Sequence, residues 1–122
     1  MATLIIEPTK KTPEINFNAE AGQLSLTGMS CSENALGFYQ PIYQWLDENA
    51  SIFPEGTTFL LKLKYYNTSS AKCILELLDK IASISSKNTP ISITWDIDGD
   101  DDMRESAENY SSIIDYPIEI IG

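Results

Sequence analysis

The stretch of sequence that decides the fold is "TTFLLKLKYYNTSSAKCILELLDKI", residues 57–81. Its first ten residues alternate with the two-residue period of a β-strand. The predicted strand has one apolar face, formed by Phe59, Leu61, Leu63 and Tyr65. Its other face is mixed and is formed by Leu60, Lys62, Lys64 and Tyr66. From residue 71 onward the apolar residues follow helical spacing. The pattern therefore predicts a strand over 57–66 and an amphipathic helix over 71–84.

The two-residue period of strands and the helical spacing also predict the secondary structure of the rest of the chain. Strands are predicted over 3–7, 91–97 and 117–121, and a hairpin over 14–28. Further helices are predicted over 32–50, with Ser32 as its cap, and from about Asp101 to Ile113. Pro41 lies four residues after Gly37 in the first helix, and its ring would press on the Gly37 carbonyl, so we expect a kink there.

The alternation also indicates how the layers are arranged. Strands buried on both faces would be continuously apolar, and these strands are not, so helices are expected on one face of the sheet only. Strand–helix–strand passages from 57–66 to 91–97 and from 91–97 to 117–121 imply a mixed sheet. The predicted fold class is α/β (α+β), with a single mixed β-sheet of about five to six strands and about three helices mainly on one face. One domain is expected over residues 1–122.

Composition narrows the class of partner. The formal net charge is -10 and the sequence pI is near 4.2, which argues against nucleic acid and anionic membranes as partners. No apolar run is long enough to insert into a membrane, and the N-terminal residues do not resemble a secretory signal. Cys31 and Cys73 lack metal-type spacing and indicate reduced thiols. We therefore expect a cytoplasmic protein.

The residues for common catalytic chemistry are missing. The sequence contains no histidine, which is the most frequent acid–base residue and the usual partner of a nucleophilic serine or cysteine. It also has no glycine-rich loop of the phosphate-binding type. We expect a protein that is not an enzyme, has no catalytic residue and uses no cofactor.

The acidic segment over residues 96–108 invites a comparison with calcium loops. The calcium-loop template requires glycine at its sixth position and glutamate at its twelfth. Those positions hold Asp101 and Ala107 if the loop starts at Asp96, and Met103 and Asn109 if it starts two residues later. Both registers fail, so no metal site is predicted. The segment is interpreted as an acidic turn that leads into a helix, with an acidic docking surface as the competing interpretation.

The cluster Asn67–Ser70 allows two interpretations. Asn, Thr and Ser are ordinary caps between a strand and a helix, and such a cap stabilises the helix by about 1 kcal/mol. The first turn, however, has no acidic residue, and Lys72 lies near the positive helix end. A phosphate on Thr68 would face free backbone N–H groups and Lys72, with Lys62 or Lys64 within possible reach. The residues alone leave the cap and the modification site as alternatives.

Three blocks of the sequence resemble a known family. They are "EPTKKTPEINFNAEAGQLSLTGMSCSENALGFYQPIYQWL", "YYNTSSAK" and "WDIDGDDDMRESAENY". In order and spacing they are similar to the SiaC family of bacterial regulatory phosphoproteins. The resemblance implies a fold like that of STAS-type anti-sigma-factor antagonists. It also implies a threonine phosphorylated by a dedicated Ser/Thr kinase and dephosphorylated by a metal-dependent Ser/Thr phosphatase, with the unmodified form binding and activating a diguanylate cyclase.

Mapped onto this chain, the resemblance implies specific site residues. The phosphorylation site would be Thr68, flanked by Asn67, Ser69, Ser70 and Lys72. Candidate partner-binding residues are Lys62, Lys64, Tyr66, Asp100, Asp101, Asp102, Glu105 and Glu108. The chain departs from the family pattern at Met29, Ser32 and Ala107, where arginine, proline and glycine are usual. The alternative function is a constitutive, non-enzymatic protein-binding module in which the Asn-Thr-Ser-Ser motif only caps a helix.

Overall fold

The computed structural model describes residues 3–122 and shows one six-stranded sheet with the strands in sequence order. The strands are β1 (Thr3–Ile6), β2 (Glu14–Asn18), β3 (Gln23–Ser30), β4 (Thr57–Tyr66), β5 (Ile91–Asp96) and β6 (Ile118–Ile121). The helices are α1 (Ala35–Asn49), α2 (Thr68–Lys87) and α3 (Asp101–Ile114), and a short 3-10 turn, η1 (Ala50–Ile52), follows α1. Within residues 3–122 no helix is both long and apolar enough to cross a membrane.

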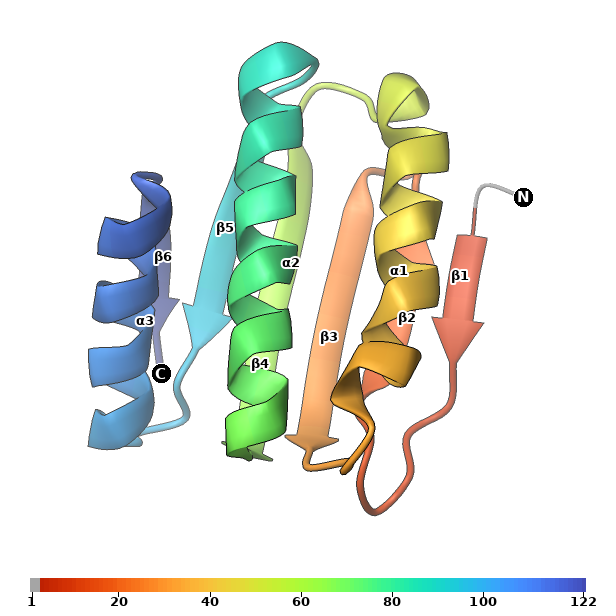
Figure 1. Cartoon of the computed structure of the whole chain (residues 1–122). Helices are drawn as coiled ribbons and strands as arrows, with labels where there is room; N and C mark the ends of the chain where they lie inside the picture. The colour runs from red at the N-terminus through yellow and green to blue at the C-terminus, as the bar shows by residue number, and fades with distance from the viewer. Residues whose placement is uncertain (1–2) are drawn as a thin grey trace.

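The sheet is mixed, as predicted. The strands β1, β2 and β3 pair antiparallel, whereas β3, β4, β5 and β6 run parallel and are joined by α1, α2 and α3 in turn. All three helices cover one face of the sheet and begin at the edge where β3, β4 and β5 end (Figure 1). The predicted α/β class is confirmed. The passage from β3 through α1 to β4 is a third parallel crossover, which the strand pattern did not predict.

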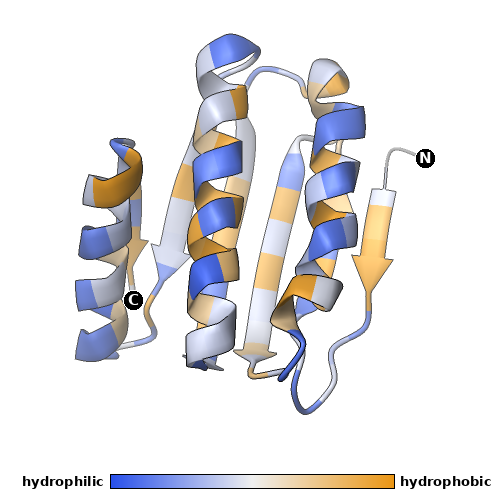
Figure 2. Cartoon of the chain, viewed as in Figure 1, coloured by the Kyte–Doolittle hydropathy of each residue, from blue (hydrophilic) through white to orange (hydrophobic). Residues whose placement is uncertain are grey.

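The core lies between the sheet and the helices. Along β4 the side chains of Phe59, Leu61 and Leu63 are buried, and Trp95 of β5 is fully buried beside them. Figure 2 shows the corresponding alternation of apolar and polar residues along β3. Hydrophobic burial of this kind contributes roughly 25 cal/mol for each Å² of apolar surface removed from water. The alternation therefore fixes which face of the sheet the helices cover.

A β-bulge near the end of β4 changes which face its last side chains occupy. Gly28 pairs with Leu63, but Met29 pairs with Tyr65, so Lys64 is the extra residue. Beyond it Tyr66 turns to the helix side, where its hydroxyl donates a hydrogen bond to Ser106 Oγ (2.7 Å). The prediction that Tyr65 is on the buried face and Tyr66 on the opposite one was therefore wrong; Tyr65 is 53% exposed.

The helix starts also differ from the prediction in detail. The cap of α1 is Asn34 and not Ser32, because the Asn34 side chain accepts a hydrogen bond from the Gly37 N–H (3.1 Å). The Ser32 hydroxyl accepts a bond from the Asn34 N–H (3.1 Å) and so helps to orient that cap. The second helix begins at Thr68, three residues before the predicted start at 71.

Candidate functional site

The first turn of α2 does not need the Thr68 hydroxyl as a cap. Asn67 is the capping residue, and its Oδ1 accepts a hydrogen bond from the Ser70 N–H (2.9 Å). Thr68 is the first helical residue and is exposed, and no hydrogen bond joins its hydroxyl to another of the residues 3–122. The motif therefore does cap the helix, as one of the two interpretations predicted, but the cap is the Asn67 amide and not a hydroxyl. Thr68 itself is exposed to solvent.

The four motif residues divide into two structural and two accessible ones. Ser70 is fully buried, and the Ser30 hydroxyl donates to Ser70 Oγ at 2.8 Å. Ser30 Oγ is also 2.8 Å from the hydroxyl of Tyr39, which is fully buried in α1. Burial raises the pKa of Tyr39 to about 12, so this phenol is neutral at physiological pH. Asn67 and Ser70 therefore build the site, whereas Thr68 and Ser69 are exposed on its surface.

Asn67 also joins the start of α2 to the loop between β3 and α1. Its Nδ2 donates a hydrogen bond to the Ser32 carbonyl (3.2 Å), and its backbone N–H donates to the Ser30 carbonyl (3.0 Å). These bonds and the Ser30–Ser70 pair hold two segments that are more than thirty residues apart in sequence. The loop and the helix start are therefore joined next to Thr68.

The predicted lysine neighbours of Thr68 lie in different places. Lys72 is exposed one turn after Thr68, and residues four apart are neighbours on a helix surface. Lys62 instead forms an ion pair with Asp96 (3.8 Å) on the open face of the sheet, so its predicted reach to Thr68 is not supported. Lys64 lines a hollow of about 290 Å³ at the end of β4, together with Tyr66, Asp100 and Asp102.

The acidic segment starts α3, as one of its two interpretations predicts. Asp100 caps the helix, and its Oδ1 accepts hydrogen bonds from the N–H groups of Asp102 (2.9 Å) and Met103 (3.2 Å). Its carboxylate is therefore engaged within the turn. The carboxylates exposed along the helix are those of Asp101, Asp102, Glu105 and Glu108.

Two tyrosines attach the acidic helix α3 to the rest of the site. The Tyr66 hydroxyl bonds to Ser106, and the Tyr110 hydroxyl donates to the Ala71 carbonyl in the first turn of α2 (3.4 Å). Burial raises the pKa of Tyr110, so the phenol keeps its proton. The helices α2 and α3 thus begin at the same edge of the sheet (Figure 1).

Comparison with known proteins places this chain in a family. Residues 6–122 match the model of the SiaC family regulatory phosphoproteins. The chain belongs to the SiaC family. An uncharacterized protein of Pseudomonas aeruginosa (strain UCBPP-PA14) is 29% identical over 121 residues, which are 98% of this chain and 96% of that protein.

Solved SiaC structures have the same fold. The crystal structure of apo-SiaC from Pseudomonas aeruginosa is 28% identical, with a TM-score of 0.87 and full coverage of both chains. A second structure is the diguanylate cyclase SiaD in complex with its activator SiaC from Pseudomonas aeruginosa. It matches with 26% identity and a TM-score of 0.79, over 97% of this chain and 98% of that chain.

Several residues that build the site had no signal in the sequence. Ser30, Tyr39 and Tyr110 were not predicted as part of it. Ser30 lies 40 residues from Ser70, and Tyr110 lies 39 residues from the carbonyl to which it donates. Only the pairing of β3 with β4 and the placement of α3 beside α2 bring these groups together.

Of the three departures from the SiaC pattern, Ala107 is fully buried, Met29 adjoins the bulge, and the Ser32 carbonyl accepts the bond from Asn67.

Proposed function

We propose that this SiaC family member is a cytoplasmic signalling adaptor that is switched by reversible phosphorylation of Thr68. A partner Ser/Thr kinase adds the phosphate and a metal-dependent Ser/Thr phosphatase removes it. The unphosphorylated form binds and regulates an effector such as a diguanylate cyclase. The choice of effector is supported by the SiaC relative that is the activator of the cyclase SiaD.

One observation carries this proposal: the motif separates its structural residues, Asn67 and Ser70, from its exposed residues, Thr68 and Ser69. Asn67 supplies the cap and Ser70 is buried in the hydroxyl chain, so neither function depends on the side chain of Thr68. A constitutive module that uses the motif only as a cap would not need an exposed threonine at the first helical position. The geometry therefore favours a modified residue.

The helix start is suited to carry the phosphate without unfolding. A phosphate adds roughly −1.5 to −2 charges and three acceptor oxygens. The N-terminal end of a helix favours negative charge, the first turn of α2 contains no acid, and Lys72 lies on the same helical face. The folded domain should tolerate the group. A partner surface that packs around a neutral hydroxyl should instead be blocked by its bulk, charge and hydration.

The test is to map phosphate on the chain purified from its native cell. Phosphopeptide mapping should find it on Thr68, and Thr68→Ala should remove it. Ser69→Ala is the matched control, because Ser69 is the next residue and is also exposed. Phosphate that persists in Thr68→Ala, or a native protein with none, would contradict the proposal.

The chain should receive phosphate but not transfer it. It has no histidine and no phosphate-binding glycine loop, so purified protein with ATP alone should stay unlabelled. Stoichiometric labelling without a second protein would show that the chain is itself a kinase.

A further inference from the structure

Only some of the residues that follow Thr68 in sequence are accessible in the folded chain. Ser70, Cys73 and Ile74 are buried in α2, and between residues 68 and 74 the exposed side chains are those of Thr68, Ser69 and Lys72. An enzyme that binds the folded domain can therefore contact Thr68, Ser69 and Lys72, but not the buried side chains between and after them. It meets one face of a helix turn.

A second segment lies directly beside that turn. Residues 31–34 connect β3 to α1, and Glu33 and Asn34 are exposed. The Asn67 amide holds this loop through the Ser32 carbonyl, and the Ser32 hydroxyl in turn accepts a bond from the Asn34 N–H. The accessible surface around Thr68 thus includes both segments. The Asn67 amide bonds to the loop itself, whereas the Ser30–Ser70 hydroxyl pair and the Asn67 backbone N–H join the end of β3 to the start of α2.

We infer that Asn67 is a positioning residue that makes this two-segment surface, and that the enzyme which phosphorylates Thr68 recognises the surface rather than the linear segment 67–72. The inference rests on the proposed function. In the phosphorylation step the Thr68 hydroxyl oxygen attacks the γ-phosphorus of ATP, ADP leaves, and the hydroxyl proton passes to a base of the kinase. Asn67 takes no part in that chemistry and acts through the loop it holds.

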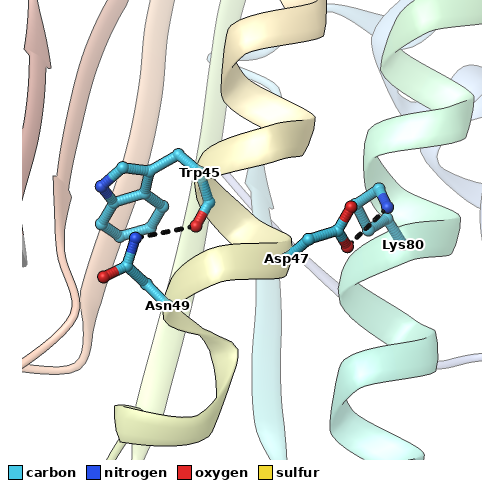
Figure 3. A network of polar contacts seen from close by, with 4 residues as sticks. All are labelled: Trp45, Asp47, Asn49 and Lys80. Carbon is cyan, nitrogen blue, oxygen red and sulfur yellow. Dashed lines mark hydrogen bonds and ion pairs between the residues drawn. The ribbon is translucent and has the colours of Figure 1, made fainter.

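The two roles of Asn67 can be separated by substitution. Its Oδ1 caps α2, whereas its Nδ2 holds the loop. Asn67→Ser and Asn67→Asp both keep a capping oxygen and lose the amide donor, and serine adds no charge. The matched controls are Asn49→Ser and Asn49→Asp, because Asn49 Nδ2 donates to the Trp45 carbonyl (2.9 Å) near the far end of α1 (Figure 3).

The experiment measures labelling of Thr68 by a kinase fraction enriched from the native cell, with ATP as the donor. Substrates are the full chain, the four variants and a synthetic peptide of residues 62–81. We expect both Asn67 variants to raise KM at least tenfold while kcat stays near the wild-type value, because the loop serves docking. The Asn49 variants should behave as wild type, melting temperatures should be similar across the set, and the peptide should be a poor substrate.

Two results would overturn the inference: a peptide that is labelled as efficiently as the folded chain, or Asn67 variants that keep the wild-type KM. Either would leave the proposed function intact, because Thr68 would still be phosphorylated. A wild-type chain that receives no phosphate at Thr68 would instead defeat the proposed function, and this inference with it.

Discussion

Ser30 is the residue on which the polar core beneath Thr68 depends. Ser30 is 2% exposed, and its hydroxyl lies 2.8 Å from both the Tyr39 hydroxyl and Ser70 Oγ. Because Ser30 donates to Ser70, the phenol of Tyr39 is left to donate to Ser30. The three hydroxyls thus form one continuous hydrogen-bonded chain. The chain of hydroxyls therefore fixes the position of Ser70 and, with it, the first turn of α2.

Removing different hydroxyls from this hydrogen-bonded series should lower the free energy of unfolding by unequal amounts. Ser30→Ala leaves two buried hydroxyls without this partner and should lower the free energy of unfolding by about 2 to 3 kcal/mol. Ser70→Ala removes only the end of the chain and should cost about 1 kcal/mol. Urea denaturation of both variants measures the difference. A loss in Ser70→Ala equal to or larger than that in Ser30→Ala would contradict this arrangement.

At the scale of elements, the start of α1 combines a cap and a glycine that fit each other closely. A Cβ added to Gly37 would lie 2.5 Å from Asn34 Nδ2 and 2.9 Å from Asn34 Cγ. Asn34 is the cap, and its Oδ1 accepts the bond from the Gly37 N–H. The glycine thus leaves room for the capping side chain. The sequence suggested a different role for Gly37, in which it accommodates the Pro41 ring that presses on its carbonyl. The helix kink expected near Pro41 stays a prediction.

Gly37→Ala should therefore fail to stabilise the helix. Replacing an interior helical glycine by alanine usually gains about 1 kcal/mol, but here the displaced Asn34 cap should lose about as much. The gain should reappear in an Asn34→Gly background, where no side chain is displaced. A double-mutant cycle on thermal unfolding measures this coupling. Equal effects of Gly37→Ala in the two backgrounds would rule it out.

A helix or strand could be predicted from the sequence where one physical signal dominates its segment. The limits of β4 follow from its alternation, and α3 follows from acids placed at a helix N-terminus. Caps were less predictable, because Ser32 and Asn34 are both good caps and only the packed loop selects between them. The β4 bulge left no mark on the sequence pattern, so the faces of Tyr65 and Tyr66 were exchanged. The predicted phosphosite is exposed, but the hydroxyl chain beneath it depends on contacts between distant elements.

At the scale of the whole molecule, several tyrosine phenols and one cysteine thiol should make the free energy of unfolding depend on pH in the alkaline range. Burial raises the pKa of Tyr39, Tyr43, Tyr110 and Cys73. A raised pKa means that the folded state keeps a proton that the unfolded state has already lost. The free energy of unfolding should therefore be unaffected by these groups below about pH 9 and should fall as pH rises further.

Tyr39 allows this dependence to be tested on one group. Its pKa is raised to about 12, so its contribution should be lost between about pH 10 and pH 12, with a slope of up to about 1.4 kcal/mol per pH unit. Tyr39→Phe should flatten the profile of unfolding free energy above about pH 10. Tyr65→Phe serves as the control, because Tyr65 is 53% exposed. An unchanged slope in Tyr39→Phe would contradict the role given to this phenol.

The central claim, that the charge on Thr68 selects the partner, is tested most directly by titrating the diguanylate cyclase proposed as effector with the unmodified and the Thr68-phosphorylated chain. Coupling of about 1–3 kcal/mol predicts that phosphorylation weakens binding by about 5–150-fold. Thr68→Ala should bind like the unmodified chain, and Ser83→Asp, which adds charge to an exposed site later in α2, should also do so. Melting curves of all forms confirm that each is folded. Equal affinity of the phosphorylated and unmodified chains would contradict the claim.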